Sequence, residues 1–264
     1  MDNLTVSSQT ESGGEVISSP DSLALPWKIL VGTHHKTGTV WLNSVFRNIC
    51  ISHQLKYRES DLDTPEDDQY DVLFHNASKF DNTTLSQLFR GIHVIRDPRD
   101  IIVSGCFYHL RSDEAWLFTP QHYLNGRTYK DTICQLENLD EQLLFEMENH
   151  GTWTISQICS WNYKNPSFFE VKYEELIEDS TLLIFRDIFL FLGFPRSSLP
   201  NLLSIAYQNS IFSLNYQNSQ HIRSGKPNDW KQYFKPRHKE KFLELFGNVL
   251  IDLGYEKDNS WEGY

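Results

Sequence analysis

Apolar runs alternate with amphipathic stretches along most of the chain, and this alternation predicts a parallel α/β sheet. Four apolar runs are typical of buried strands and cover residues 27–34, 71–75, 91–97 and 168–171. Apolar residues at helical spacing predict helices at 39–53, 98–110 and 181–194. A buried strand, a glycine turn and a helix open such a sheet, and the repetition favours one α/β domain.

Three segments interrupt this alternation, and we expect them to decorate the sheet around a site, at 59–71, 113–150 and 197–229. The first contains seven acidic residues and no base. The second contains a stretch, 129–148, that predicts one long acidic amphipathic helix. The third has no charged residue over 197–222, which predicts a helix followed by a mobile loop that could close as a lid.

Charge and targeting signals exclude several classes of function. The chain has 35 acidic and 24 basic residues and a formal charge of −11, which argues against a nucleic-acid or anionic-membrane partner. No stretch is apolar enough to span a bilayer. Residues 1–25 lack the basic and apolar regions of a secretory signal and predict a disordered tail on a cytoplasmic protein, with the folded domain at 26–264. The cysteines form no CxxC pair and are expected to be reduced core thiols rather than metal ligands: Cys50, Cys106, Cys134 and Cys159.

The first predicted strand leads into the sequence GTHHKTGTVW at 32–41. Lys36, Gly38 and the hydroxyls of Thr37 and Thr39 lie at a strand-to-helix turn, where backbone N–H groups and the positive helix end can surround a phosphate. An ATPase P-loop places its lysine directly after the last glycine, whereas Lys36 precedes Gly38. This order argues against a kinase or NTPase. An ordinary turn with a surface lysine is the alternative.

A second basic motif, VIRDPRDIIVSGCFYH, covers 94–109. Arg96 closes a buried strand and Ser104 follows within the next helix, for which Asp97 is a suitable N-cap and Pro98 fits the first turn. A guanidinium and a hydroxyl placed in this way can converge on one phosphate at the carboxyl edge of the sheet. The alternative is that Arg96 pairs with a neighbouring aspartate and that Ser104 only packs.

A third basic motif, HIRSGKPNDWKQYF, follows the charge-free segment at 221–234. Arg223 and Lys226 flank the flexible Gly225, which predicts a basic loop that closes over an anion. A solvated turn with incidental charge is the alternative.

In their order and separation, the three motifs resemble the cofactor-binding signatures of the PAPS-dependent sulfotransferases, where PAPS is 3′-phosphoadenosine 5′-phosphosulfate. The loop at 32–41 is similar to the 5′-phosphosulfate loop, the segment at 94–109 to the 3′-phosphate strand and helix, and IRSGKPNDW to the late closing loop. FFEVKYEELIED at 168–179 and NSIFSL at 209–214 resemble the family's two adenine-side segments. The resemblance runs from about 27 to 252. It implies a P-loop-like three-layer fold with a central parallel sheet flanked by helices, PAPS as co-substrate, PAP as product and no metal.

The resemblance also implies roles for single residues. The 5′-phosphosulfate would lie among Lys36, Thr37, Gly38, Thr39 and the backbone amide of Val40. The 3′-phosphate would be held by Arg96, Ser104, Arg223, Ser224 and Gly225. The adenine would contact Trp41, Tyr173, Ser210 and Phe212, for which core filling is the alternative. His75 would be the general base of an in-line transfer, although a histidine at a strand end can be purely structural, and Lys36 would neutralise charge on the leaving oxygen.

Two departures from the family pattern stand out. Many cytosolic members have a lysine two residues before the catalytic histidine, where this chain has Leu73. Many also carry a Lys-Thr-Val-Glu dimer motif that the stretch WKQYFKPRHKEKF lacks, so both a monomer and a homodimer stay open.

The acceptor is expected to be the hydroxyl or amine of a small molecule. Acidic residues at 59–71 and 137–148 favour a cationic metabolite, and a solvated acidic surface is the alternative. A carbohydrate or a tyrosyl peptide is the alternative acceptor. A PAP-binding protein without catalysis and a P-loop kinase are the alternatives of other classes.

Overall fold

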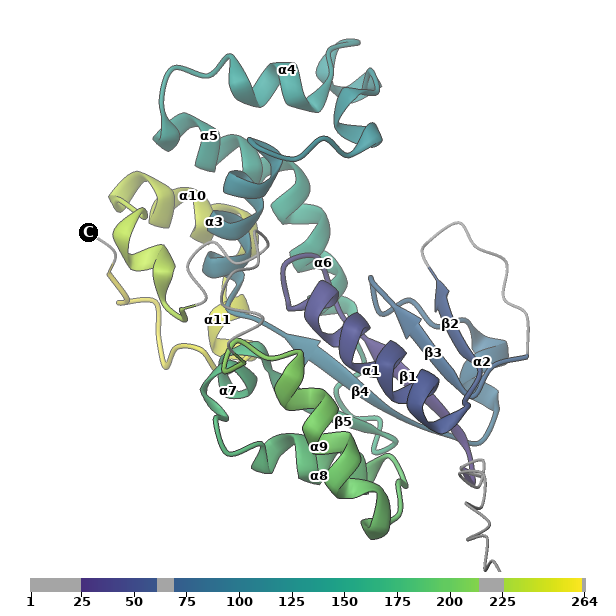
Figure 1. The fold of residues 1–264 in the computed structure, drawn as a ribbon. Coiled ribbons are helices and arrows are strands. Elements are labelled where there is room, and N and C mark those ends of the chain that lie inside the picture. The colour runs from purple at the N-terminus through teal and green to yellow at the C-terminus, as the bar shows by residue number, and fades with distance from the viewer. Residues whose placement is uncertain (1–24, 61–68, 214–225, 263–264) are drawn as a thin grey trace, which may run out of the picture.

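The computed structural model describes residues 25–60, 69–213 and 226–262. A parallel five-stranded sheet with the order β2-β3-β1-β4-β5 forms its middle layer (Figure 1). The strands are β1 (Lys28–Gly32), β2 (Tyr57–Ser60), β3 (Val72–His75), β4 (Phe89–Ile95) and β5 (Phe168–Lys172). The α-helices are α1 (Thr39–His53), α2 (Asn82–Ser86), α3 (Pro98–His109), α4 (Tyr129–Cys134), α5 (Leu139–Glu146), α6 (Thr152–Ser160), α7 (Tyr173–Glu178), α8 (Leu183–Phe191), α9 (Leu199–Gln208), α10 (Pro236–Phe246) and α11 (Val249–Asp252).

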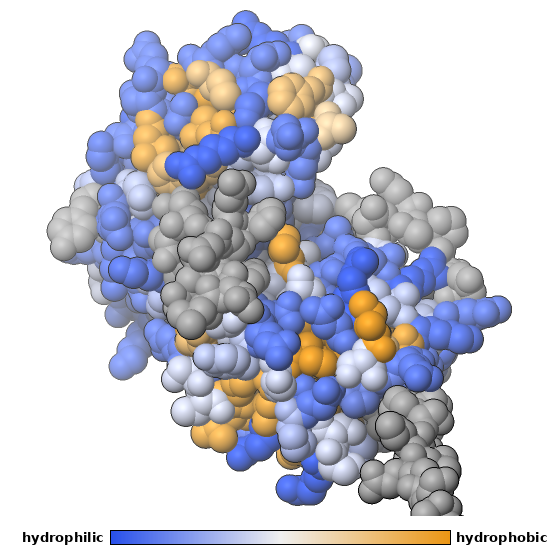
Figure 2. Space-filling view, in the orientation of Figure 1, coloured by the Kyte–Doolittle hydropathy of each residue, from blue (hydrophilic) through white to orange (hydrophobic). Residues whose placement is uncertain are grey.

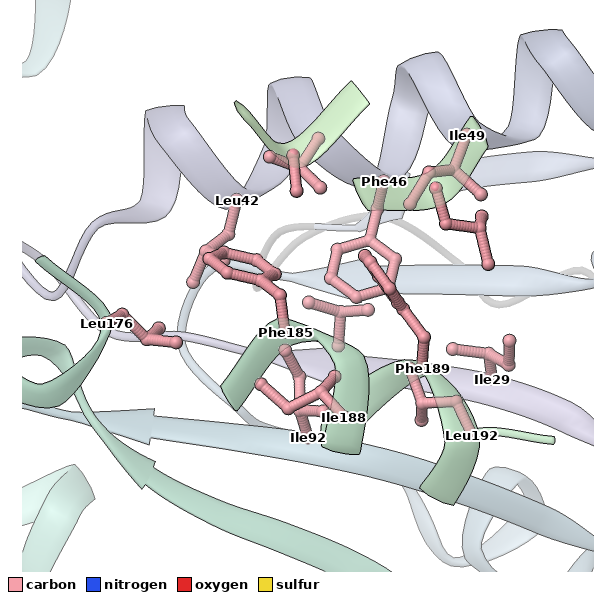
Figure 3. Close-up of a cluster of buried hydrophobic side chains, with 14 of the residues drawn as sticks. Ile29, Leu42, Phe46, Ile49, Ile92, Leu176, Phe185, Ile188, Phe189 and Leu192 are labelled. Carbon is pink, nitrogen blue, oxygen red and sulfur yellow. The ribbon is translucent and has the colours of Figure 1, made fainter. Parts of the chain in front are cut away.

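The largest hydrophobic core lies between one face of the sheet and α1, α8 and α9. In Figure 3, Phe185 and Phe189 of α8 point toward Leu42 and Phe46 of α1. All four side chains are fully buried. Burial of a side chain of this size stabilises the fold by about 1.5–3 kcal/mol. This core therefore fixes α1, and with it the loop before α1, against the sheet.

A second core joins the helices that follow the carboxyl ends of the strands. Side chains from α3, α4, α5, α10 and α11 pack together there, around the buried Trp230 and Phe242. Most of the face in Figure 2 is polar, with separate apolar patches over the α4–α5 region and over α8 and α9. Across the three described ranges, no helix combines the length and apolarity that a membrane span requires.

The four predicted strands are confirmed as β1, β3, β4 and β5. The predicted cap of α3 is also confirmed, since the Asp97 carboxylate accepts the Arg99 N–H at 2.9 Å and Pro98 occupies the first turn. β2, which pairs with β3 at the sheet edge, was not predicted from the sequence. Residues 1–24, 61–68 and 214–225, which include most of the predicted tail and the predicted mobile loop, lie outside the described residues.

Two other predictions were wrong. The stretch predicted as one acidic helix at 129–148 forms α4 and α5, because Asn138 interrupts it and caps α5 by accepting the Glu141 N–H at 3.1 Å. Asn competes with helical hydrogen bonding and favours a cap. Of the four cysteines, only the first two are core thiols, since the last two are exposed near helix ends: Cys50, Cys106, Cys134 and Cys159.

Candidate active site

The loop between β1 and α1 turns sharply and leaves the start of the helix open. Lys36 and Gly38 have positive φ angles of 63° and 91°, which turn the chain sharply into the helix. The Thr37 hydroxyl accepts the His34 N–H at 2.8 Å, and both Thr37 and Thr39 donate to the His34 carbonyl. α1 then begins without a side-chain cap and without an acidic residue in its first turn. Its first N–H groups and its positive dipole end therefore suit a phosphate or sulfate group.

Gly38 is required at its position by the aromatic ring beside it. A Cβ atom there would lie 3.0 Å from the Tyr173 ring. Tyr173 also meets Trp41 edge-on, with ring centroids 6.4 Å apart. The loop and two of the predicted adenine-site residues thus lie together, although Trp41 is also part of the main core.

Arg96 connects this loop to the end of β4. Its Nη1 donates a 3.0 Å hydrogen bond to the Lys36 carbonyl oxygen, and its guanidinium lies 4.7 Å from the Tyr173 ring centre. Its Nε is buried without a hydrogen-bond partner. A buried unpaired donor is costly, so this nitrogen is suited to an incoming anion.

The alternative that Arg96 pairs with a neighbouring aspartate does not hold among the described residues. Asp97 instead binds Arg99 at 2.7 Å. Asp100 accepts the backbone N–H groups of Asn228 at 2.9 Å and Trp230 at 2.8 Å. Burial raises the pKa of Asp100 to about 6.

The bonds from Asp100 attach the end of the predicted closing loop to α3. The predicted 3′-phosphate residues of that loop lie outside the described residues: Arg223, Ser224 and Gly225. Ser104, which was also predicted to hold the 3′-phosphate, lies half-buried in the middle of α3.

The predicted adenine-side residues Ser210 and Phe212 lie in the turn after α9. The Ser210 hydroxyl donates to the Tyr207 carbonyl at 2.7 Å and accepts the Phe212 N–H at 3.2 Å, so it shapes this turn. Asn48 of α1 donates to the side-chain oxygen of Asn209 at 3.2 Å. The turn therefore lies against α1, the helix that carries Trp41.

His75 lies at the end of β3 and is almost fully buried. Its Nδ1 accepts the Ala77 N–H at 3.2 Å, which places the proton of the neutral ring on Nε2. Leu73, on the same face of β3, is fully buried in an apolar cluster that includes Leu30 and Phe168. Position 73 therefore supplies no charge beside His75, and its side chain is part of the core.

A polar network that was not predicted from the sequence crosses the sheet beside His75. His75 and His93 are both in register with Gly32, and Glu170 of β5 is in register with His93. Glu170 accepts from His93 Nδ1 at 2.6 Å, and His93 Nε2 lies 2.9 Å from His34 Nε2. Burial, with His93 nearby, lowers the pKa of His34 to about 3.

The hydrogen bonds of this network fix its protons. Glu170 holds the proton of His93 on Nδ1, so His93 Nε2 accepts and His34 Nε2 donates. His34 Nδ1 is then an acceptor. The Gln157 side-chain oxygen lies 3.4 Å from this nitrogen and Gln157 Nε2 has no partner, so the amide has to flip for Nε2 to donate to His34 Nδ1.

Gly32 makes room for the turn that follows His75. A Cβ atom at Gly32 would lie 2.7 Å from the Ser78 hydroxyl oxygen. That hydroxyl donates to the Thr33 carbonyl at 2.9 Å and so ties the turn after β3 to the end of β1.

The amine of Lys36 lies on the side of the loop that faces the helical region. Its Nζ is 3.9 Å from the Tyr108 ring centre. The Tyr108 hydroxyl donates to Glu114 at 2.7 Å. A hollow of about 420 Å³ lies in the same region. It is lined by Tyr123, Glu148, Asn149, His150 and Trp153. The ring centre of His150 lies 4.4 Å from that of His35 on the loop.

Bases at the start of α10 and within it pair with part of the acidic segment 137–148. Lys235 binds Asp140 at 2.6 Å, and Arg237 binds Glu141 at 2.8 Å. Lys241 of α10 binds Glu148 at 3.2 Å. These pairs leave the acidic segment with less unpaired negative charge than the sequence alone indicated.

Comparison with known proteins gives one consistent result. A family model described as the sulfotransferase domain matches residues 26–254. Human sulfotransferase 2A1 is 25% identical over 259 residues, which cover 87% of this chain and 80% of that protein.

Two solved structures share the fold. Mouse sulfotransferase SULT7A1 complexed with PAP gives a TM-score of 0.55 at 20% identity, covering 86% of this chain and 87% of that one. Retinol dehydratase in complex with androsterone and inactive cofactor PAP gives 0.53 at 15% identity, covering 88% and 83%.

Proposed function

The chain belongs to the sulfotransferase family and is a PAPS-dependent enzyme, and from this we propose that it moves a sulfuryl group to the hydroxyl or amine of a small molecule. The observation that carries the site assignment is the hydrogen bond from Arg96 to the Lys36 carbonyl. It joins the loop assigned to the 5′-phosphosulfate with the strand end assigned to the 3′-phosphate. The unpaired Nε of Arg96 and the uncapped start of α1 support the fit of a bisphosphorylated nucleotide.

In the proposed reaction, the acceptor oxygen or nitrogen attacks sulfur in line as the bond from sulfur to the bridging phosphate oxygen breaks. PAP leaves with that electron pair, and the acceptor proton passes to His75. Lys36 and the first amides of α1 stabilise the charge on the leaving oxygen. For His75 to accept at Nε2, its own proton has to occupy Nδ1, so the 3.2 Å bond from Ala77 opens first.

The test is transfer of radiolabelled sulfate from PAPS, with His75→Ala, Lys36→Ala and the control His122→Ala, an exposed histidine of the helical region. We expect His75→Ala to lower turnover by about 10²–10⁴-fold and still bind PAP. Lys36→Ala should lower turnover by roughly 10²–10³-fold. Wild-type turnover in either variant removes that residue from the mechanism. Stabilisation of the fold by PAP without any transfer identifies a non-catalytic binder, and stabilisation by ATP alone identifies a kinase.

The acceptor is proposed to be cationic. The proposal is based on one carboxylate rather than on the number of acidic residues in the chain. Glu114 supports the proposal, because its carboxylate accepts only from neutral donors in its contacts with Tyr108 and Trp116, at 2.7 Å each. Turnover of matched cationic and neutral alcohols at increasing ionic strength tests it. A cationic preference that disappears in Glu114→Gln supports a steering charge. A rate that does not respond to salt contradicts it.

A further inference from the structure

Three histidines from distant parts of the chain meet beside the phosphosulfate loop. His35 lies on that loop, His109 ends α3, and His150 lies in the π-helical turn Met147–Gly151. One ring nitrogen from each lies within 4.8 Å of the other two. The ring centres are 4.4–5.1 Å apart, and the rings of His35 and His109 are stacked at 9°.

Each of the three rings has one buried nitrogen that lacks a hydrogen-bond partner. Nε2 of His35, Nε2 of His109 and Nδ1 of His150 are buried and form no hydrogen bond. Buried polar atoms in folded proteins are almost always paired, so three unpaired nitrogens at one point need a common partner. A metal ion that accepts a lone pair from each ring satisfies all three together.

The surroundings orient one of these rings in the way that metal sites do. The Glu146 carboxylate is buried and accepts from His109 Nδ1 at 2.7 Å and from the Tyr129 hydroxyl at 2.8 Å. With the proton of His109 held on Nδ1 by this bond, Nε2 is the nitrogen left to bind a ligand. Gly105 makes room for this carboxylate, since a Cβ atom there would lie 2.5 Å from Glu146 Oε1.

Two of the rings, His35 and His150, also favour the neutral form that a metal requires. Burial lowers the pKa of His35 well below its ordinary value and that of His150 to about 4. Neutral imidazole is the form that binds metals. Trp116 stacks against His150 at 5.3 Å and limits its rotation.

We propose that His35, His109 and His150 bind one divalent transition-metal ion, with Zn²⁺ as the best match. Three imidazoles without a thiolate suit Zn²⁺ and other late first-row transition metals. Three protein ligands leave a fourth coordination position open. The hollow of about 420 Å³ reaches His150 and provides an entry path. The site is separate from the proposed sulfuryl transfer, which needs no metal.

The proposal is tested by titrating the tag-free, metal-stripped full chain with Zn²⁺ in a calorimeter and with Co²⁺ in a spectrophotometer. We expect one ion per chain, a rise in melting temperature, and the visible absorption of Co²⁺ in a low-coordinate nitrogen site. His35→Asn and His150→Gln should each weaken Zn²⁺ binding by more than tenfold. Glu146→Gln, which replaces the carboxylate that orients His109 and also accepts from Tyr129, should weaken it about 10–100-fold.

His122→Ala is the matched control, because His122 is exposed in the same helical region and outside the cluster. It should bind Zn²⁺ like the wild type. Circular dichroism of each variant without metal shows whether it folds. A folded wild-type chain that binds no Zn²⁺ overturns the proposal, and so does a folded His35→Asn, His150→Gln double variant that binds as tightly as the wild type. Neither result bears on transfer from PAPS.

Discussion

The Arg96 guanidinium donates a 3.0 Å hydrogen bond to the carbonyl oxygen of Lys36. One cation thereby holds the turn of the anion-binding loop while its buried Nε stays available. The two halves of the proposed nucleotide site are thus coupled before any ligand binds.

Arg96→Lys separates charge from geometry at this contact. A lysine keeps the positive charge but cannot form the same fork of hydrogen bonds, and it loses the planar contact with Tyr173. We expect PAP affinity to fall by about 10–100-fold, as lost charge-assisted hydrogen bonds of about 1.5–3 kcal/mol imply. Calorimetric titration with PAP measures this. Unchanged affinity contradicts the assignment of Arg96 to a phosphate.

Gly38→Ala tests whether the Tyr173 ring defines the loop. The alanine meets both a positive φ and a Cβ contact of 3.0 Å, whereas Gly126→Ala meets a φ of 80° with no atom within 4 Å. We expect Gly126→Ala to lower the free energy of unfolding by about 1 kcal/mol and Gly38→Ala by more, about 2–3 kcal/mol. Urea denaturation compares them. Equal losses would falsify a role for the ring contact.

Asp100→Asn removes a titration that lowers stability as pH rises. Because the pKa of Asp100 is raised from 3.8 to about 6 in the folded protein, the folded state binds the proton more tightly than the unfolded state. Its stabilising contribution is therefore complete below about pH 4 and lost by about pH 7, on the order of 3 kcal/mol. We expect the wild type to lose stability relative to Asp100→Asn across this window in urea titrations. Parallel pH profiles contradict it.

Glu170→Gln places an amide where a carboxylate receives two donors. Glu170 accepts from His93 at 2.6 Å and from the Trp161 indole at 2.7 Å, and glutamine offers one oxygen for both. We expect the free energy of unfolding to fall by about 1–3 kcal/mol, against little change for the exposed Glu178→Gln. Thermal and urea unfolding of both variants measure the difference. Equal stability of the two shows that the network is not held by this carboxylate.

The strand-turn-helix units could be predicted because local patterns encode them. In β4 the apolar residues Ile92, Val94 and Ile95 are buried and indicate a strand, and Asp97 and Pro98 mark the start of the next helix. β2 could not be found in this way. It is an edge strand with the sequence YRES, and an edge strand need not be apolar on both faces.

Local sequence could predict only those contacts of the candidate site that lie within one motif. Lys36 and Gly38 belong to one short loop, and their proximity follows from the chain itself. His93, Glu170 and His150 come from separate elements, and a single histidine in an apolar strand was the only signal for the first. Their meeting depends on strand order and helix packing, which local periodicity does not encode.

Gly32 carries no functional group, yet the geometry around His75 depends on it. Any larger residue at the end of β1 would push Ser78 outward and displace the turn after β3. The orientation of the proposed base therefore depends on β1 as well as on β3, the strand that carries it. A search for variants that tune this imidazole would therefore do well to begin one strand away from it.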